Sequence, residues 1–451
     1  MEILVKATQF ILSLSLLIAL HELGHYATAK WFKIRVEKFY LFFNPWFSLW
    51  KKKIGETEWG IGWLPLGGYV KISGMIDESM DKEQMKKPPQ PWEFRSKPAW
   101  QRLIVMLGGV TVNLLLGYFI FMMILFVWGN ERLEPQKMPF GIYADELGQE
   151  YGLKTGDKLV SLNGEKLNSF KDFRSGILLD NKTELIVERN GQEVSISLPE
   201  DIEYQMIKKD GANALFTMPI PFIVDDYPED IQFKNAQEAG ILPGDSIVGV
   251  NNQATPYFQD FSLALKDKAG EKISVKYYRE GKLDSVTVEV AEDKRGDETV
   301  GVIGIKPVDD ITRWYEIEED HYGFFASIPA GFAYGNKVLS GYVKQMKFLF
   351  TSKGVSQLGG FGSIANMFGE IWVWENFWRM TALLSIILAF MNILPIPALD
   401  GGHVVFLLYE MITGRAPHQK VLEYAQIVGF VILFSLILYA NGNDIYRYFF
   451  K

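Results

Sequence analysis

Four long apolar runs separate the polar stretches of this 451-residue chain. They cover residues 7–32, 103–128, 380–411 and 425–440. About 20 apolar residues in a helix cross the ~30 Å hydrocarbon core of a bilayer, so the pattern predicts four transmembrane helices. The third run is interrupted by two prolines and a glycine pair between residues 395 and 402. A signal peptide is the alternative for the first run, which lacks a basic start and a small-residue cleavage site.

Shorter periodicities appear between the first two runs. Residues 69–72 alternate in polarity, and residues 59–66 are apolar and rich in glycine. Residues 38–75 therefore look like strands and turns rather than helix. The segment forms either a small cytoplasmic hairpin or a hairpin that re-enters the membrane, where surrounding protein must shield its backbone.

A repeat lies between the second and third runs. Residues 152–164 and residues 240–252 share a G-(L/I)-x-x-G-D-x-(L/I)-V-x-(L/V)-N pattern at an offset of 88 residues. Each copy reads as a turn that feeds a strand, and further alternating strands are predicted at Glu184–Glu188 and Lys272–Tyr278. The pattern resembles PDZ domains, which bind extended peptides by adding a strand to a sheet edge.

The charge distribution predicts which side of the membrane each part of the chain faces. Residues 30–102 carry 14 Lys and Arg against 8 Asp and Glu, whereas residues 131–375 carry 26 against 40. Basic flanks of membrane helices face the cytoplasm, so the acidic repeat region and both termini are expected outside. The acidic bulk argues against nucleic acid as a partner.

The first apolar run contains an H-E-x-x-H motif, His21-Glu22-Leu23-Gly24-His25. Residues at i and i+4 share one helix face, so both imidazoles can bind one metal ion. Ionisable side chains inside an apolar span are costly unless they are compensated, and a bound cation compensates them. The alternative to a metal site is a pair of helix histidines whose hydrogen bonds are satisfied within the protein. Because the chain has no cysteine, zinc must use His, Asp or Glu ligands.

A third ligand has to come from another span. Asp400 is the only acid between Arg379 and Glu410, and it lies where prolines and glycines break the third run. His403 is the rival ligand, and a helix-end cap is the structural alternative for Asp400.

H-E-L-G-H in the first span and L-D-G-G-H in a later one resemble the site-2 protease family of intramembrane zinc metalloproteases. The order of parts is similar to its bacterial branch, the regulator of sigma-E proteases. The resemblance implies a multi-pass α-helical membrane protein with about four transmembrane helices, a membrane-associated β-hairpin and two extracytoplasmic PDZ domains of α+β type. The expected parts are a first transmembrane helix with H-E-x-x-H (1–35), a cytoplasmic or re-entrant hairpin segment (36–100), a second transmembrane helix (101–130), two PDZ domains (131–217 and 218–308), a linker with an amphipathic helix (309–375), a third transmembrane helix with L-D-G-G-H (376–413) and a fourth with the C-terminal tail (414–451).

The same resemblance assigns roles to residues. It implies that His21, His25 and Asp400 bind Zn²⁺, that Glu22 is the catalytic acid and base, and that Asn392 helps to hold substrate. It also matches the 65–71 stretch Pro-Leu-Gly-Gly-Tyr-Val-Lys, and Gly108 with Asn113 in the second span. Two stretches depart from the family pattern, around Asn44-Pro45 and Phe361-Gly362, and leave substrate contacts there open.

The expected activity is hydrolysis of a peptide bond in or near the transmembrane segment of a single-pass membrane protein. The resemblance implies an anti-sigma factor or similar regulator that another protease has already cut, in regulated intramembrane proteolysis linked to a stress response. It implies a bacterial inner membrane location, with the PDZ pair on the periplasmic side, where the pair acts as a size filter, and the active site towards the cytoplasm. Two alternatives are a non-catalytic membrane scaffold presenting PDZ domains and a metal transporter, which would need ionisable residues along several spans.

Overall fold

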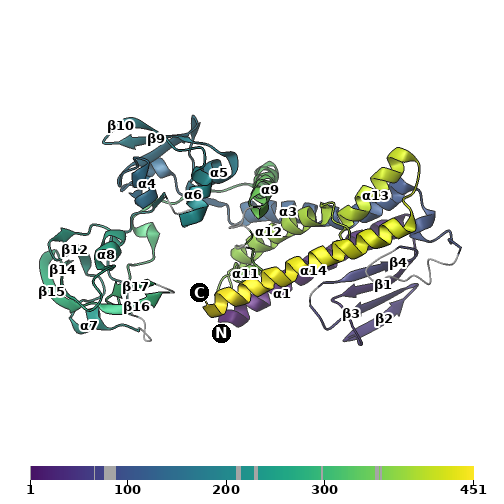
Figure 1. Cartoon of the computed structure of the whole chain (residues 1–451), viewed down its shortest axis with the longest axis horizontal. Coiled ribbons are helices and arrows are strands. Elements are labelled where there is room, and N and C mark those ends of the chain that lie inside the picture. The colour runs from purple at the N-terminus through teal and green to yellow at the C-terminus, as the bar shows by residue number, and fades with distance from the viewer. Residues whose placement is uncertain are drawn as a thin grey trace. The chain divides into compact units, whose positions relative to one another are not determined.

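The computed structural model describes residues 2–65, 67–75, 88–209, 215–227, 232–295, 298–350, 355 and 358–450. Leu66 of the 65–71 stretch and residues 76–87 of the predicted hairpin segment therefore lie outside the described residues. The chain divides into two compact units (Figure 1). The first contains Met1–Asn130 and His321–Phe449, and the second contains Glu131–Asp320.

Helices dominate the first unit. They are α1 (Glu2–Trp31), α3 (Ala99–Val127), α9 (Phe324–Gln345), α11 (Phe361–Ala365), α12 (Trp374–Ile393), α13 (Asp400–Thr413) and α14 (Gln419–Phe450). Of these, α1, α3, α12 and α14 are long and apolar enough to cross a membrane. Four candidate spans together with several β-sheets make this a membrane protein with β elements, as predicted.

The third predicted span is two helices rather than one. Helix α12 ends at Ile393 and α13 begins at Asp400. Pro395 and Pro397 lack a backbone N–H, and each disfavours helical geometry at the residue before it. Ala398 has a φ of 84°, a left-handed conformation that takes the chain out of α12 before it turns into α13.

Helix α3 is packed by α1, α9, α12 and α13. It meets α1 at glycines: a Cβ on Gly24 would lie 2.4 Å from the carbonyl oxygen of Gly108. A Cβ on Gly108 would lie 2.7 Å from the hydroxyl of Thr28. Small residues let helix backbones touch where lipid supplies no hydrophobic drive for association. The crossing of α1 and α3 is therefore in backbone contact.

The segment after α1 forms a four-stranded sheet. Its strands are β1 (Val36–Leu41), β2 (Trp50–Ile54), β3 (Thr57–Ile61) and β4 (Tyr69–Ile72), in the order β2-β3-β1-β4. Strand β1 runs parallel to β3 and antiparallel to β4. The predicted hairpin segment (36–100) contains the hairpin β2–β3, whereas residues 59–72 do not form one, because β3 and β4 lie on opposite sides of β1. Among the described strands, β4 is an edge of this sheet.

The second unit contains two β-rich halves that follow the sequence repeat. The first half has α4 (Glu146–Glu150), α5 (Phe170–Asp180), α6 (Ile202–Lys209) and the sheet β10-β9-β7-β8, from β7 (Lys158–Leu162), β8 (Glu165–Lys166), β9 (Glu184–Arg189) and β10 (Gln192–Ser197), with β6 (Tyr143–Ala144) paired to β11 (Phe216–Thr217). The second half has α7 (Asn235–Glu238), α8 (Phe258–Leu265) and the sheet β13-β12-β14-β15, from β12 (Ser246–Val250), β13 (Gln253–Ala254), β14 (Lys272–Arg279) and β15 (Lys282–Glu289), with β16 (Ala291–Arg295) paired to β17 (Glu298–Val302). Each half has its own hydrophobic core. The strands predicted at 184–188 and 272–278 are present.

The repeated Gly-Asp pairs have a structural explanation. Asp157 is 1% exposed; its carboxylate accepts from Arg189 Nε at 2.7 Å and from the Lys154 backbone N–H at 2.8 Å. In the second half, Asp245 accepts from Arg279 Nε and from the Leu242 backbone N–H, both at 2.8 Å. The repeated aspartate thus holds a turn and a strand together in both halves.

The ends of the second unit meet. Strand β5 (Asn130–Arg132) pairs with β18 (Glu318–Asp320), and Arg132 forms ion pairs with Glu318 at 2.9 Å and Asp320 at 3.3 Å.

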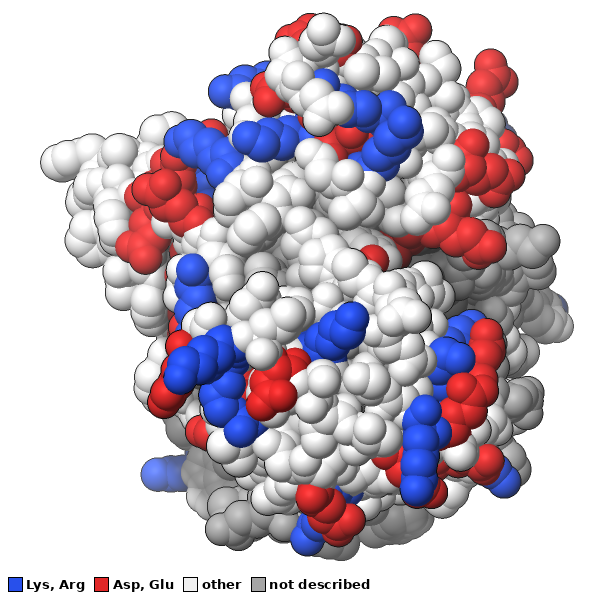
Figure 2. All heavy atoms as spheres, turned by 90° about the vertical axis from the view of Figure 1, so that its left-hand side faces the viewer, with Lys and Arg blue, Asp and Glu red and all other residues white. Residues whose placement is uncertain are grey.

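The face in Figure 2 mixes acidic and basic side chains and has no continuous basic patch among the described residues it shows.

Candidate metal centre

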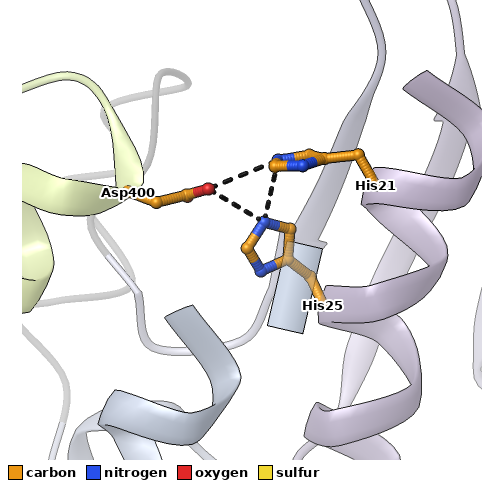
Figure 3. Close-up of side chains that lie close together, drawn as sticks. All are labelled: His21, His25 and Asp400. Atoms are coloured by element: carbon orange, nitrogen blue, oxygen red, sulfur yellow. Dashed lines mark hydrogen bonds and ion pairs between the residues drawn. The ribbon is translucent and has the colours of Figure 1, made fainter. Parts of the chain in front are cut away.

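Two histidines and one aspartate converge in the first unit (Figure 3). His21 Nε2 and His25 Nε2 each lie 3.3 Å from Asp400 Oδ2, and the two nitrogens lie 3.2 Å apart. The three side chains come from α1 and from the first residue of α13. The geometry brings together the three residues that the sequence analysis proposed as metal ligands.

Local backbone geometry explains the position of Asp400. It begins α13 directly after the irregular 394–399 segment. A Cβ on Gly401 would lie 2.2 Å from the carbonyl oxygen of Leu394, and one on Gly402 would lie 2.7 Å from that of Ile396. Only glycine allows this segment to fold so closely onto the start of α13. The carboxylate is thereby carried to α1 from a helix end rather than from within a helix.

The three atoms fit a zinc ion. Ligands about 2.05 Å from a tetrahedral zinc lie about 3.3 Å apart, which is the spacing of these atoms. His25 Nδ1 donates to the Val105 carbonyl oxygen at 2.8 Å, because a carbonyl can only accept. With Nδ1 bonded to the main chain, Nε2 is the ring nitrogen that faces the carboxylate and is placed to bind a metal ion. Asp400 Oδ2 is buried and has no hydrogen-bond partner. Electron-rich atoms converge in this way around a cation.

The cluster opens into a cavity of about 610 Å³. Glu22 lines it one residue after His21, and Asn392 lines it from the last turn of α12. Strand β4 supplies Tyr69 and Val70 to the wall, and the preceding Gly68 is so close that its Cβ would lie 3.5 Å from Glu22 Cγ. All four proposed catalytic and metal residues, with Asn392, therefore border one space.

His403 lies less than one helical turn beyond Asp400 and lines the same cavity. In the part of the chain that the structure describes, the group of side chains able to hold one metal ion contains Asp400 and not His403. The geometry therefore favours Asp400 among the two alternatives.

The two departures from the family pattern have defined contacts. Asn44 Oδ1 accepts from the Tyr69 hydroxyl at 3.0 Å, and the Pro45 carbonyl accepts from Trp63 Nε1 at 2.9 Å. Phe361 lines the cavity from α11, and its backbone N–H donates to Asn441 of α14 at 3.1 Å. Asn44-Pro45 thus shapes the sheet, whereas Phe361 borders the site itself.

The sequence analysis named Asn113 as a family match but assigned it no contact, and it did not name Val105 or Gly109 of α3. Val105 receives the bond from His25, and the Asn113 amide lies 3.3 Å from His21 Nδ1. Gly109 lies between them, where a Cβ would be 2.5 Å from His25 Nε2. The three residues recur every fourth position, a spacing that marks one helix face. That spacing was the available signal, although nothing in it pointed to α1.

Similarity to known proteins extends over almost the whole chain. A model of Peptidase family M50 matches residues 9–436. The chain is 28% identical over 453 residues to the regulator of sigma-E protease RseP of Escherichia coli (strain K12), covering 97% of this chain and 98% of that protein. It is 27% identical over 467 residues to a Vibrio cholerae protein named as a zinc metalloprotease, covering 99% of both. It is 27% identical over 474 residues to the regulator of sigma E protease of Haemophilus influenzae, covering 99% of this chain and all (100%) of that protein.

Proposed function

The chain belongs to Peptidase family M50 and is a membrane-embedded zinc metalloprotease, and we propose that His21, His25 and Asp400 hold its zinc ion while Glu22 moves the protons. The observation that carries this assignment is the convergence of two imidazole nitrogens and one carboxylate oxygen at 3.2–3.3 Å. Their spacing suits tetrahedral zinc with one position left for water or substrate.

Glu22 is suited to the role of general base and acid. It precedes Leu23-Gly24-His25 on the same helix and lies about 100° round the axis from His21, on the wall of the cavity that the ligands share. When bound, zinc supplies Lewis-acid chemistry for the scissile carbonyl and for the attacking water. The Glu22 carboxylate takes a proton from that water and delivers it to the nitrogen of the leaving amine.

Substrate has to arrive as an extended strand, because a helix hides its carbonyl groups in i→i−4 hydrogen bonds. Strand β4 is an edge strand that borders the cavity through Tyr69 and Val70. An extended segment can add to such an edge through main-chain hydrogen bonds. We propose that it lies between β4 and Asn392, whose amide offers both a donor and an acceptor.

The names of two relatives support a proposal for the substrate class. Two of them are named as regulators of sigma-E, so we propose a single-pass membrane protein of the anti-sigma factor kind, cut after a first cleavage elsewhere. The two halves of the second unit are proposed to be PDZ domains (131–217 and 218–308) that exclude untrimmed substrates. By the charge distribution, this unit faces the periplasm of a bacterial inner membrane, and the active site lies towards the cytoplasm.

The test is Glu22→Gln in the full-length protein, purified in detergent. The amide keeps the shape of the side chain but cannot take a proton, so cleavage should fall by several orders of magnitude while bound zinc stays at one equivalent. The probe is a purified single-span anti-sigma factor lacking its outer domain. Glu56→Gln is the matched control, since Glu56 is exposed and, among the described residues, its carboxylate pairs with Lys30 alone, at 3.5 Å. Wild-type cleavage by the Glu22 variant would overturn the proposal.

A further inference from the structure

One face of α3 lies against both histidine rings. Val105, Gly109 and Asn113 follow one another at four-residue intervals, and His25 and His21 do the same on α1. The Val105 carbonyl accepts from His25 Nδ1 at 2.8 Å, and the Asn113 amide lies 3.3 Å from His21 Nδ1. Each ring thus has a partner on α3 at the nitrogen that points away from Asp400.

The gap between these partners contains only backbone. A Cβ on Gly109 would lie 2.5 Å from His25 Nε2 and 2.6 Å from His21 Cε1. Both rings are therefore pressed against the helix that supplies their hydrogen-bond partners.

Asn113 is rigidly placed. It is 1% exposed, and its backbone carbonyl accepts from the Ser385 hydroxyl of α12 at 2.6 Å. Its Nδ2 faces His21 Nδ1, and its Oδ1 is buried and has no hydrogen-bond partner among the described residues. Amide oxygen and nitrogen have nearly the same shape, so their assignment follows from the hydrogen-bond network. Turning the amide by 180° gives the unpaired oxygen a donor, namely Nδ1–H of His21.

We propose that Asn113 is a positioning residue for the metal centre. Its Oδ1 accepts a hydrogen bond from His21 Nδ1–H, which fixes the tautomer that leaves Nε2 free to bind the metal. The Val105 carbonyl does the same for His25 through the main chain. Partners of this kind fix ring orientation and tautomer, and they raise the basicity of the ligand nitrogen. The proposal rests on the proposed role of His21 as a zinc ligand.

Two substitutions test whether Asn113 acts by accepting a hydrogen bond from His21. Asn113→Leu keeps the volume and removes the acceptor, so affinity for Zn²⁺, measured by chelator competition on the full-length protein, should fall about 10- to 100-fold. Asn113→Asp keeps the acceptor and cannot donate when ionised, so affinity should stay within a few-fold of wild type. The d–d absorption of bound Co²⁺ should change in the Leu variant and be retained in the Asp variant.

Thr381→Val is the matched control. It removes another fully buried hydrogen bond between spans, from Thr381 to Ser13 at 2.9 Å; in the described chain the Thr381 hydroxyl also bonds the Phe377 carbonyl, on its own helix. It should leave Zn²⁺ affinity and the Co²⁺ spectrum unchanged even where it lowers the melting temperature. A drop in affinity equal to that of Asn113→Leu would mean that general loosening, not ring positioning, controls the metal.

A second readout does not require the Asp variant to fold. With ¹⁵N-labelled histidine in the zinc-loaded wild type, His21 should show a protonated Nδ1. Wild-type affinity in Asn113→Leu, equal losses in folded Leu and Asp variants, or an unprotonated His21 Nδ1 would each overturn the inference. His21→Ala identifies the other failure: if it retains zinc, the proposed ligand set itself is wrong.

Discussion

Replacing Gly24 with alanine tests whether the crossing of α1 and α3 sets the geometry of the metal centre. Gly24 lies between His21 and His25 on α1. An added Cβ would lie 2.4 Å from the Gly108 carbonyl oxygen, 2.6 Å from its carbon and 2.9 Å from the Gly109 nitrogen. All three are backbone atoms, which cannot rotate away as a flexible side chain would.

The magnitude follows from these distances. Ordinary contact begins at 3.4 Å, so α1 has to move by about 1 Å relative to α3. Alanine favours a helix over glycine by ~1 kcal/mol, whereas overpacking costs about 1–3 kcal/mol, so the net change in stability should be small. A displacement of about 1 Å at a catalytic centre costs about 100-fold in rate. We therefore expect a large loss of cleavage and weaker zinc binding with a modest change in melting temperature.

The measurements are cleavage rate, zinc content and thermal unfolding of the full-length protein in detergent. Gly442→Ala provides the same substitution in another candidate span, where an added Cβ meets no atom of the described residues within 4 Å. The reasoning fails if Gly24→Ala cleaves as fast as Gly442→Ala and both match wild type. It also fails if the loss of activity accompanies global unfolding, because the displacement argument requires a folded chain.

Three further outcomes are expected. Asp400→Ala should lose more bound zinc than His403→Ala, as metal analysis of both purified variants will show; an empty site only in the His403 variant would reverse the ligand assignment. Arg189→Ala should destabilise the first half of the second unit by about 3 kcal/mol, because it leaves the buried Asp157 carboxylate without its counter-charge, and adding Asp157→Asn should restore part of the loss in denaturant melts. Deleting residues 133–317 should preserve cleavage of a trimmed substrate and abolish protection of an untrimmed one; if the deleted enzyme, still active, discriminates as the full chain does, the size-filter idea does not apply.

Hydrophobic pattern and motif spacing predicted much of the fold. Four apolar runs became four candidate spans because length and composition alone decide whether a helix can cross a bilayer. The i, i+4 spacing of His21 and His25 placed both on one face for the same local reason. The proline and glycine pairs near Pro395 and Gly401 predicted a break, and the structure ends α12 and starts α13 on either side of it.

Pairing between strands and contacts between distant residues could not be predicted from the sequence in the same way. The order β2-β3-β1-β4 depends on which strands meet after the chain has turned, and alternation in residues 69–72 contains no information about the partner strand. The choice between Asp400 and His403 stayed open because both follow the same break. The contact of Asn113 with His21 joins positions 92 residues apart, and no local pattern encodes it.

The pairing of β5 with β18 has a topological consequence. The chain leaves the helical unit after α3 and returns before α9 through two strands held side by side, with Arg132 bridging to Glu318 and Asp320. The second unit is therefore an insertion whose entering strand β5 and leaving strand β18 are hydrogen-bonded to each other, and a short loop can join these two strands. Since α3 and α9 pack directly on each other, the helical unit holds its own ends together. Unfolding or replacement of the insertion therefore need not change the geometry of the metal centre.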